Sequence, residues 1–325
     1  MIHSSSGALG TTSSVIMEKK SHKNGMNNPY LAYVVKSLLQ LVLMTAVFTS
    51  FPLWASSDKP AFTHGYAVCM GGSTQLLAAQ HADASFPLMS VIKFPLAILV
   101  LHEVEQGHLT LSTRYHLSAK QLPTDTWSPL AQAHPQGGEF TLQELLQAAV
   151  SQSDNNACAQ LFRLIGGAPA LQAYLRREMG EDIAITITHG EDYFRKRSQL
   201  TENNATPRAM VQLLYACFIE KRLLSPALTQ LLWDIMSSPS AGAPRLAAGI
   251  PTGAALAHKT GSSGTNAAGY TLAHNDVGVL RLPDGRTDCI SSFIHNSSET
   301  PATMEAAHAE LAKRAACLLE GNELP

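Results

Sequence analysis

The sequence has few charged residues and almost no net charge. Lysine and arginine number 23, aspartate and glutamate 25, and the formal net charge of the 325 residues is −2. Proteins that bind nucleic acid present a basic surface to the phosphates. The even balance of charge therefore argues against a nucleic-acid partner.

The sequence also lacks the residue spacings that hold metal ions. Its five cysteines include no C-x-x-C pair, and its 13 histidines include no H-E-x-x-H motif. Zinc sites are built from such clustered ligands, so no metal is predicted, and no organic cofactor is indicated. Internal repeats and low-complexity linkers are absent as well.

What the sequence does contain is a globular composition, with 45% hydrophobic residues, preceded by an N-terminal leader pattern. Residues 1–28 are polar, and Lys36 then precedes an apolar stretch, 38–54, that ends at Ala55. A positive segment, an apolar segment and a small residue in this order are typical of a secretory signal peptide. We therefore predict an extension and signal peptide over 1–55, a periplasmic or secreted location, and no stable membrane association after cleavage. A membrane anchor or a core helix is the alternative.

Strand patterns occur first and last in the rest of the chain, and helix patterns fill the middle. The predicted strands and the last helix cover 66–70, 74–79, 255–259, 268–274, 277–282, 289–295 and 301–319. Because early and late strands must pair, we predict an α+β fold with a five-stranded antiparallel sheet flanked by terminal helices and an all-helical lobe. The folded domain is predicted over 56–325, with an α/β lobe from 56–90 and 250–325 and a helical lobe from 91–249.

Ser90 and Lys93 stand three residues apart, at the start of an apolar run over 94–101. Residues at i and i+3 share one face of a helix, so the amine of Lys93 reaches the hydroxyl of Ser90. The positive end of a helix dipole favours an alkoxide or oxyanion at such a serine. The pair is typical of a nucleophile and its activating base, with a plain helix start and a surface lysine as the alternative.

Two further motifs lie downstream. Ser153-Asp-Asn155 falls between two predicted helices, where it supplies a second hydroxyl and an amide, or simply caps a helix. Lys259-Thr-Gly261 ends a predicted strand in small residues, which let a substrate lie against the backbone. A glycine-rich hairpin with a solvated lysine is the alternative there.

The order Ser90-x-x-Lys93, Ser153-Asp-Asn155 and Lys259-Thr-Gly261 is found in class A β-lactamases and penicillin-binding proteins. The chain resembles an exported class A serine β-lactamase of the PER-like extended-spectrum branch. The branch resemblance lies in 86–107, 127–129, 258–264 and 275–285. It implies that 56–325 is a catalytic domain acting on a small-molecule β-lactam as a monomer without a cofactor.

The resemblance also implies roles for single residues. Ser90 attacks the lactam carbonyl, Lys93 helps to deprotonate it, and Ser153 passes a proton to the lactam nitrogen. The backbone N–H groups of Ser90 and Ser262 form the oxyanion hole. These roles describe hydrolysis of the β-lactam amide through a Ser90 acyl-enzyme, which confers β-lactam resistance.

The resemblance further implies four substrate-binding residues. Asn155 binds the side-chain amide of the substrate, and Lys259 and Thr260 bind its carboxylate. Trp127 stacks at the mouth of the site, or alternatively anchors its loop.

Glu191 is predicted to activate the water that hydrolyses the acyl-enzyme, with Asp192 and Glu202 as lesser candidates. Arg195 falls where relatives hold an asparagine or a histidine, four residues after the glutamate. A cation so close to Glu191 would pair with it and weaken it as a base. Two alternatives therefore stay open: a penicillin-binding D,D-peptidase, and a β-lactam sensor that deacylates slowly.

Overall fold

The fold is described from a computed structural model that covers residues 61–238 and 244–320. All of these residues belong to one unit of the chain, Val47–Pro325. The predicted extension and signal peptide, 1–55, lie outside the described residues. None of the helices within the described ranges is long and apolar enough to cross a membrane.

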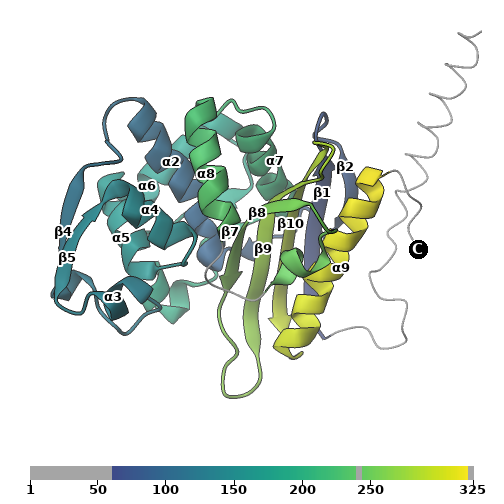
Figure 1. The fold of residues 1–325 in the computed structure, drawn as a ribbon. Helices are drawn as coiled ribbons and strands as arrows, with labels where there is room; N and C mark the ends of the chain where they lie inside the picture. The colour runs from purple at the N-terminus through teal and green to yellow at the C-terminus, as the bar shows by residue number, and fades with distance from the viewer. Residues whose placement is uncertain (1–60, 239–243, 321–325) are drawn as a thin grey trace, which may run out of the picture. The chain divides into compact units, whose positions relative to one another are not determined.

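A five-stranded antiparallel sheet forms the centre of the described unit (Figure 1). Its spatial order is β2, β1, β10, β9 and β8, so the first and last strands of the chain are neighbours. The bounds are β1 Thr63–Met70, β2 Leu76–Gln80, β8 Ala255–Ser262, β9 Thr271–Arg281 and β10 Thr287–Ser297. The predicted α+β fold with a five-stranded antiparallel sheet is confirmed.

Strand β9 replaces two strands that the sequence analysis separated at residues 275–276. The polar pair Asn275-Asp276 looked like a break, yet both side chains are fully buried within the continuous strand. The amide of Asn275 donates to the carbonyl of Pro87 at 2.7 Å, and the carboxylate of Asp276 lies 2.9 Å from Nδ1 of His258. These tertiary partners pair the amide nitrogen of Asn275 and the carboxylate of Asp276, whereas Asn275 Oδ1 has no hydrogen-bond partner among the described residues. The strand continues through both residues because most of their polar groups are paired.

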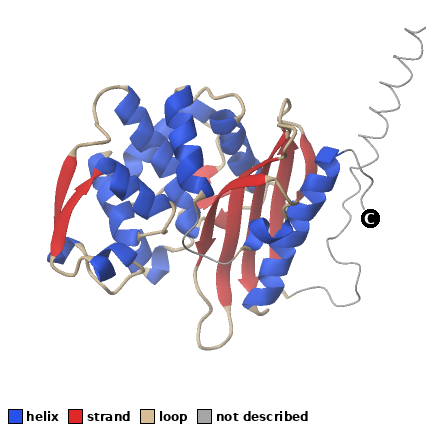
Figure 2. Cartoon of the chain, in the orientation of Figure 1, coloured by secondary structure: helices blue, strands red, loops and turns tan. Residues whose placement is uncertain are grey.

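Helices fill the chain between the two halves of the sheet and follow its last strand (Figure 2). Their bounds are α2 Lys93–Glu105, α3 Pro129–Ala133, α4 Leu142–Val150, α5 Asn155–Leu164, α6 Gly167–Met179, α7 Pro207–Phe218, α8 Pro226–Ser237 and α9 Pro301–Glu320. Helix α4 begins with a capping box, in which Glu144 N donates to Thr141 Oγ1 at 3.1 Å. The first nine residues of α2 are all buried, as its uniformly apolar sequence predicted.

The two faces of the sheet are covered differently (Figure 1). Helix α9 and the short 3₁₀ helix η5, Arg245–Gly249, pack on one face around Leu280 and Ile290. Helices α7 and α8 lie on the other face, where Val279 and Phe293 belong to the same core cluster as α2 and α4 to α7. The helical part and one face of the sheet therefore share a hydrophobic core.

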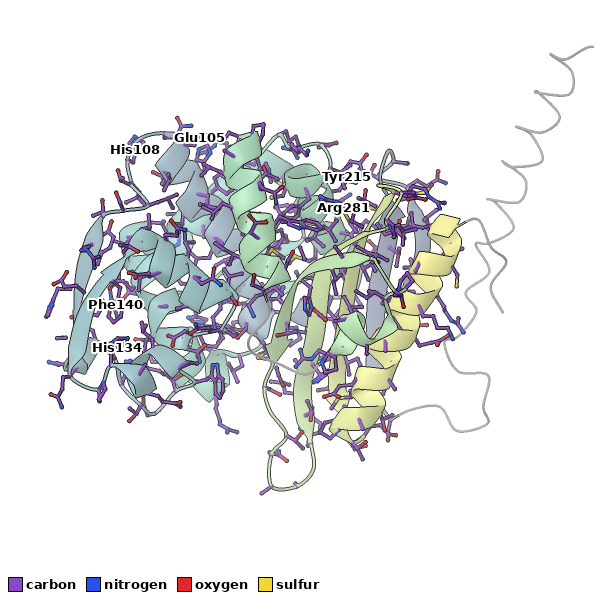
Figure 3. The ribbon with its side chains drawn as sticks, in the orientation of Figure 1. Glu105, His108, His134, Phe140, Tyr215 and Arg281 are labelled. Atoms are coloured by element: carbon purple, nitrogen blue, oxygen red, sulfur yellow. The ribbon has the colours of Figure 1, made fainter. Side chains whose placement is uncertain are left out.

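The helical part also contains short strands that the sequence analysis missed. Strands β4, Arg114–Ser118, and β5, Gly137–Thr141, pair as an antiparallel hairpin. Near its end the rings of His134 and Phe140 are in edge contact, with centroids 4.9 Å apart (Figure 3). A second small sheet joins β3, Phe86–Pro87, β7, Asn204–Ala205, and β6, Ile185–Thr186, so the loop before β7 is tied to the segment that precedes Ser90.

Candidate active site

Ser90 and Lys93 lie where the predicted helix begins, with one difference in local structure. Ser90 belongs to a 3₁₀ turn, η1, Met89–Ile92, and the α-helix α2 starts only at Lys93. The structure brings the two side chains together, with Lys93 Nζ 3.2 Å from Ser90 Oγ. Met89, directly before the serine, has a left-handed φ of 49°, a strained conformation of the kind that accumulates at functional sites.

The Ser153-Asp-Asn155 turn both caps a helix and faces Lys93. Asp154 is fully buried and caps α5, since its Oδ1 accepts from Ala157 N at 2.8 Å. Lys93 Nζ donates to the Ser153 carbonyl and to Asn155 Oδ1, both at 2.6 Å, and lies 3.4 Å from Ser153 Oγ. The motif therefore caps α5 and also contacts the amine of Lys93.

Strand β8 brings the third motif to the same point. Lys259 Nζ donates to Ser153 Oγ at 3.1 Å and to the Thr260 carbonyl at 2.9 Å. The Ser153 hydroxyl thus lies between two lysine amines. Thr260 is buried beside Lys259, and Ser262 is exposed at the end of the strand.

Burial determines the electrostatics of both lysines. It lowers the pKa of Lys93 to about 8, although nearby Cys158 and Asp154 oppose the shift. Burial also lowers the pKa of Lys259 well below its usual value, and the positive charges of Lys93 and Arg245 act in the same direction. Two buried amines side by side favour the loss of a proton from one of them.

Gly261 explains how β8 approaches the nucleophile so closely. A Cβ atom at this position would lie 2.7 Å from the Leu88 carbonyl and 3.1 Å from Val91 N. Any side chain here would push β8 away from η1, which carries Ser90. Position 261 of the Lys259-Thr-Gly261 motif therefore requires glycine, because a larger residue would collide with the backbone of η1 and of Leu88 before it.

Trp127 lies beside the Ser153 turn. Its ring nitrogen donates to the Gln152 carbonyl at 3.0 Å, and its own carbonyl accepts from Asn155 N at 3.0 Å. The side chain is 55% exposed, an unusual exposure for so large an apolar group. This geometry places an accessible aromatic surface next to Asn155.

Two residues of the site were missed by the sequence analysis. Thr126 Oγ1 accepts from Asn155 Nδ2 at 2.7 Å, so it fixes the orientation of that amide. Arg245, only 5% exposed, donates to the Gly261 carbonyl at 3.1 Å. A threonine in a polar loop and an arginine in an Ala- and Pro-rich segment carry no sequence signal for these roles.

Glu191 is not brought into this cluster. The Oε2 atom of Glu191 accepts a hydrogen bond from Arg163 Nε at 2.6 Å. The residue of this loop that contacts Lys93 is Phe194, whose ring centroid lies 4.4 Å from Lys93 Nζ. The lesser candidates also have other partners: Asp192 lies 3.8 Å from Lys196 Nζ, and Glu202 lies 2.8 Å from His189 Nε2.

The cation that pairs with Glu191 also differs from the predicted one. We expected Arg195 to pair with Glu191, but the side chain of Arg195 is exposed. Arg163 from α5 forms the ion pair with Glu191 instead. Within the ranges that the structure describes, no group of three or more histidine, cysteine or acidic residues is arranged to hold a metal ion.

Comparison with known proteins decides the family. The model of the beta-lactamase enzyme family matches residues 60–317. The chain belongs to this β-lactamase family. It is 37% identical to Beta-lactamase VEB-1 and 38% identical to Extended-spectrum beta-lactamase PER-1, both of Pseudomonas aeruginosa. Each match covers 71% of this chain, and 77% and 74% of the two relatives.

Solved structures agree with this β-lactamase assignment. A class A β-lactamase from Bacteroides cellulosilyticus matches with a TM-score of 0.76 and 28% identity, over 90% of this chain and 98% of that structure. The extended-spectrum β-lactamase TLA-1 matches with a TM-score of 0.74 and 32% identity, over 84% of this chain and 96% of that structure. The predicted resemblance to class A β-lactamases and their PER-like branch is therefore confirmed.

Proposed function

We propose that this β-lactamase hydrolyses the β-lactam amide of penicillins and cephalosporins through an acyl-enzyme on Ser90. One observation carries the residue assignment: Lys93 Nζ is hydrogen bonded to both Ser90 Oγ and Asn155 Oδ1, while Lys259 reaches the Ser153 hydroxyl beside them. A nucleophile, a base and a proton donor are thus within one hydrogen-bonded cluster.

Acylation begins when neutral Lys93 takes the proton of Ser90 as its oxygen attacks the lactam carbonyl. A pKa of about 8 leaves about one molecule in ten with a neutral amine at pH 7. When the C–N bond breaks, the lactam nitrogen takes a proton from Ser153 Oγ, which is replaced from Lys93. The proton of Ser90 has thus been passed through Lys93 and Ser153 to the lactam nitrogen. Lys93 and Ser153 recover their starting protonation states, and an ester of Ser90 remains.

The substrate is held by groups around this cluster. The ammonium of Lys259 and the hydroxyl of Thr260 bind its carboxylate, and Asn155 binds its side-chain amide. The backbone N–H groups of Ser90 and Ser262 receive the oxyanion. Trp127 covers the mouth, and its exposed ring suits the bulky side chains of extended-spectrum cephalosporins.

Hydrolysis of the ester needs a base that activates water. Glu191 is the proposed base, because it lies three residues before Phe194, which contacts Lys93. The geometry described above keeps its carboxylate on Arg163. This same observation favours a second candidate function, a β-lactam-acylated protein that deacylates slowly, as sensors and D,D-peptidases do.

We also infer that the chain is exported with removal of residues 1–55, acts in the periplasm or outside the cell, and works as a monomer without stable membrane association. The basis is the signal-peptide pattern that ends at Ala55. Sequencing the N-terminus of protein recovered from a periplasmic extract tests the cleavage, and size-exclusion chromatography with light scattering tests the monomer.

Turnover of a chromogenic cephalosporin, with intact mass measured in parallel, tests the function. Sustained turnover far beyond one equivalent, lost in Ser90→Ala, is the expected result. A burst of a single equivalent, with the added mass remaining on the Ser90 peptide, would instead establish the slowly deacylating alternative. Turnover that persists in Ser90→Ala would overturn the assignment of the nucleophile.

A further inference from the structure

The contact between Arg163 and Glu191 joins helix α5 to the loop that follows β6. Arg163 lies near the end of α5, and its Nε donates to Glu191 Oε2 at 2.6 Å. Its Nη1 also donates to Gln160 Oε1 at 3.2 Å, one helical turn earlier. The guanidinium is thus fixed on its own helix, and the glutamate is drawn to it.

The loop on either side of Glu191 is anchored. Before it, a Cβ atom at Gly190 would lie 3.1 Å from the ring of Phe162, so the backbone passes close to α5. After it, Tyr193 is fully buried, and its hydroxyl donates to the Leu200 carbonyl at 2.9 Å. Phe194 then reaches Lys93. The backbone on both sides of Glu191 is therefore held in place, and the ion pair with Arg163 determines where the Glu191 side chain points.

We infer that Arg163 is a positioning residue that holds Glu191 away from the acyl-enzyme and thereby limits the rate of deacylation. This inference rests on the proposed function, in which Glu191 activates the hydrolytic water. A general base acts only within hydrogen-bond reach of its proton, directly or through one water. A carboxylate bonded to Arg163, outside the hydrogen-bonded cluster of Lys93, must leave that partner before it acts.

The exposure of the ion pair sets the size of the effect. The side chains of Arg163 and Glu191 are 37% and 41% exposed, so water and salt weaken their attraction. Exposed ion pairs of this kind change a conformational equilibrium by roughly 2- to 5-fold. Glu191 therefore exchanges between the two positions, and Arg163 lowers the population of the active one without abolishing it.

The test compares single-turnover acylation and deacylation rates of a chromogenic cephalosporin in wild-type protein, four single variants and one double variant. In Arg163→Gln we expect deacylation to be roughly 2- to 5-fold faster and acylation to be unchanged. Arg163→Lys keeps a cation at this place and should stay close to wild type. Arg195→Gln is the matched control, because it removes one positive charge from the loop that carries Glu191 without removing the ion pair between Arg163 and Glu191.

Ionic strength gives a readout that a merely structural role of Arg163 would not move. Salt screens exposed charge pairs, with a Debye length of about 10 Å at 0.1 M and about 3 Å at 1 M. Deacylation of the wild type should accelerate as salt is added, whereas Arg163→Gln should show a flat response. Melting temperatures measured in parallel show whether each variant is folded.

The outcomes separate this inference from the proposed function. If no acyl-enzyme forms on Ser90, the proposed function fails. If the acyl-enzyme forms but Arg163→Gln deacylates at the wild-type rate or more slowly, Arg163 does not restrain Glu191 and the inference fails alone. Glu191→Gln should trap the acyl-enzyme in both the wild-type and the Arg163→Gln background. Unchanged deacylation in Glu191→Gln would also overturn the inference and leave the acyl-enzyme chemistry intact.

Discussion

Lys93 is a buried amine whose hydrogen bonds join the first two motifs, and this position determines how the reaction depends on pH. Burial lowers its pKa to about 8, so the charged form dominates below that pH and the neutral base above it. We predict that the acylation rate constant rises with pH through an apparent pKa near 8 and falls about tenfold for each pH unit below it. A stopped-flow pH profile measures this. Lys93→Arg should lose the rising limb, because a guanidinium stays protonated, and a rate independent of pH between 6 and 9 would contradict the assignment.

Asp288 on β10 is another buried titratable residue, and it lies outside the proposed active site. Neither carboxylate oxygen has a hydrogen-bond partner within the described part of the chain. Burial raises the pKa of Asp288 from 3.8 to about 8, although Arg286 opposes the shift. In this range the folded protein binds more protons than the unfolded chain, so this residue makes stability fall as pH rises from about 4 to 8. We predict that Asp288→Asn removes this slope and raises the melting temperature at pH 9 by roughly 5 °C or more. Melting temperatures of the wild type and Asp288→Asn, measured from pH 5 to 9, check this prediction. It is wrong if the two melting temperatures change with pH in the same way.

At the same scale, the sequence predicted residues that lie in motifs and missed those that act only through tertiary contacts. Ser90 and Lys93 could be paired because their spacing on one helix fixes their distance. Arg163 could not be paired with Glu191, since 27 residues and a whole helix separate them, and Arg195 was the nearer cation in sequence. Local spacing carries no information about which distant side chain reaches a loop.

At the scale of elements, the site depends on how closely strand β8 approaches the 3₁₀ turn η1. Gly261 permits this approach, and its backbone φ is not in the left-handed region, so alanine there meets only a steric obstacle. We predict that Gly261→Ala displaces β8 from Ser90 and lowers the acylation rate roughly 10- to 100-fold, with a small loss of stability. Single-turnover acylation and urea unfolding measure the two effects. Wild-type acylation in this variant would show that the strand adjusts without cost.

The elements that the sequence predicted best are those with local signals. The apolar run over 94–101 marked the start of helix α2 within a few residues. Strand β9 was divided in error because Asn275 and Asp276 are polar, and only their distant partners show why they are buried. The hairpin of β4 and β5 was missed because its strands are short and each contains a single buried residue.

At the scale of the whole described unit, one hydrophobic core joins the helices to the sheet. Val279 and Phe293 of the sheet belong to the same cluster as Leu96 of α2 and Leu213 of α7. A shared core couples the unfolding of its parts. We predict that far-ultraviolet circular dichroism, tryptophan fluorescence and loss of activity report a single coincident thermal transition. Separate transitions for helix and sheet signals would contradict this coupling.

The pairing of β1 with β10 has a consequence for synthesis. Thr63 stands opposite His295, so the earliest strand of the sheet finds its neighbour more than 200 residues later. During synthesis β1 and β2 are first a lone hairpin, which is marginally stable in water. The sheet is completed only when β10, Thr287–Ser297, has left the ribosome. The nascent sheet therefore stays open until β10 has been made, and the pairing of β10 with β1 closes it.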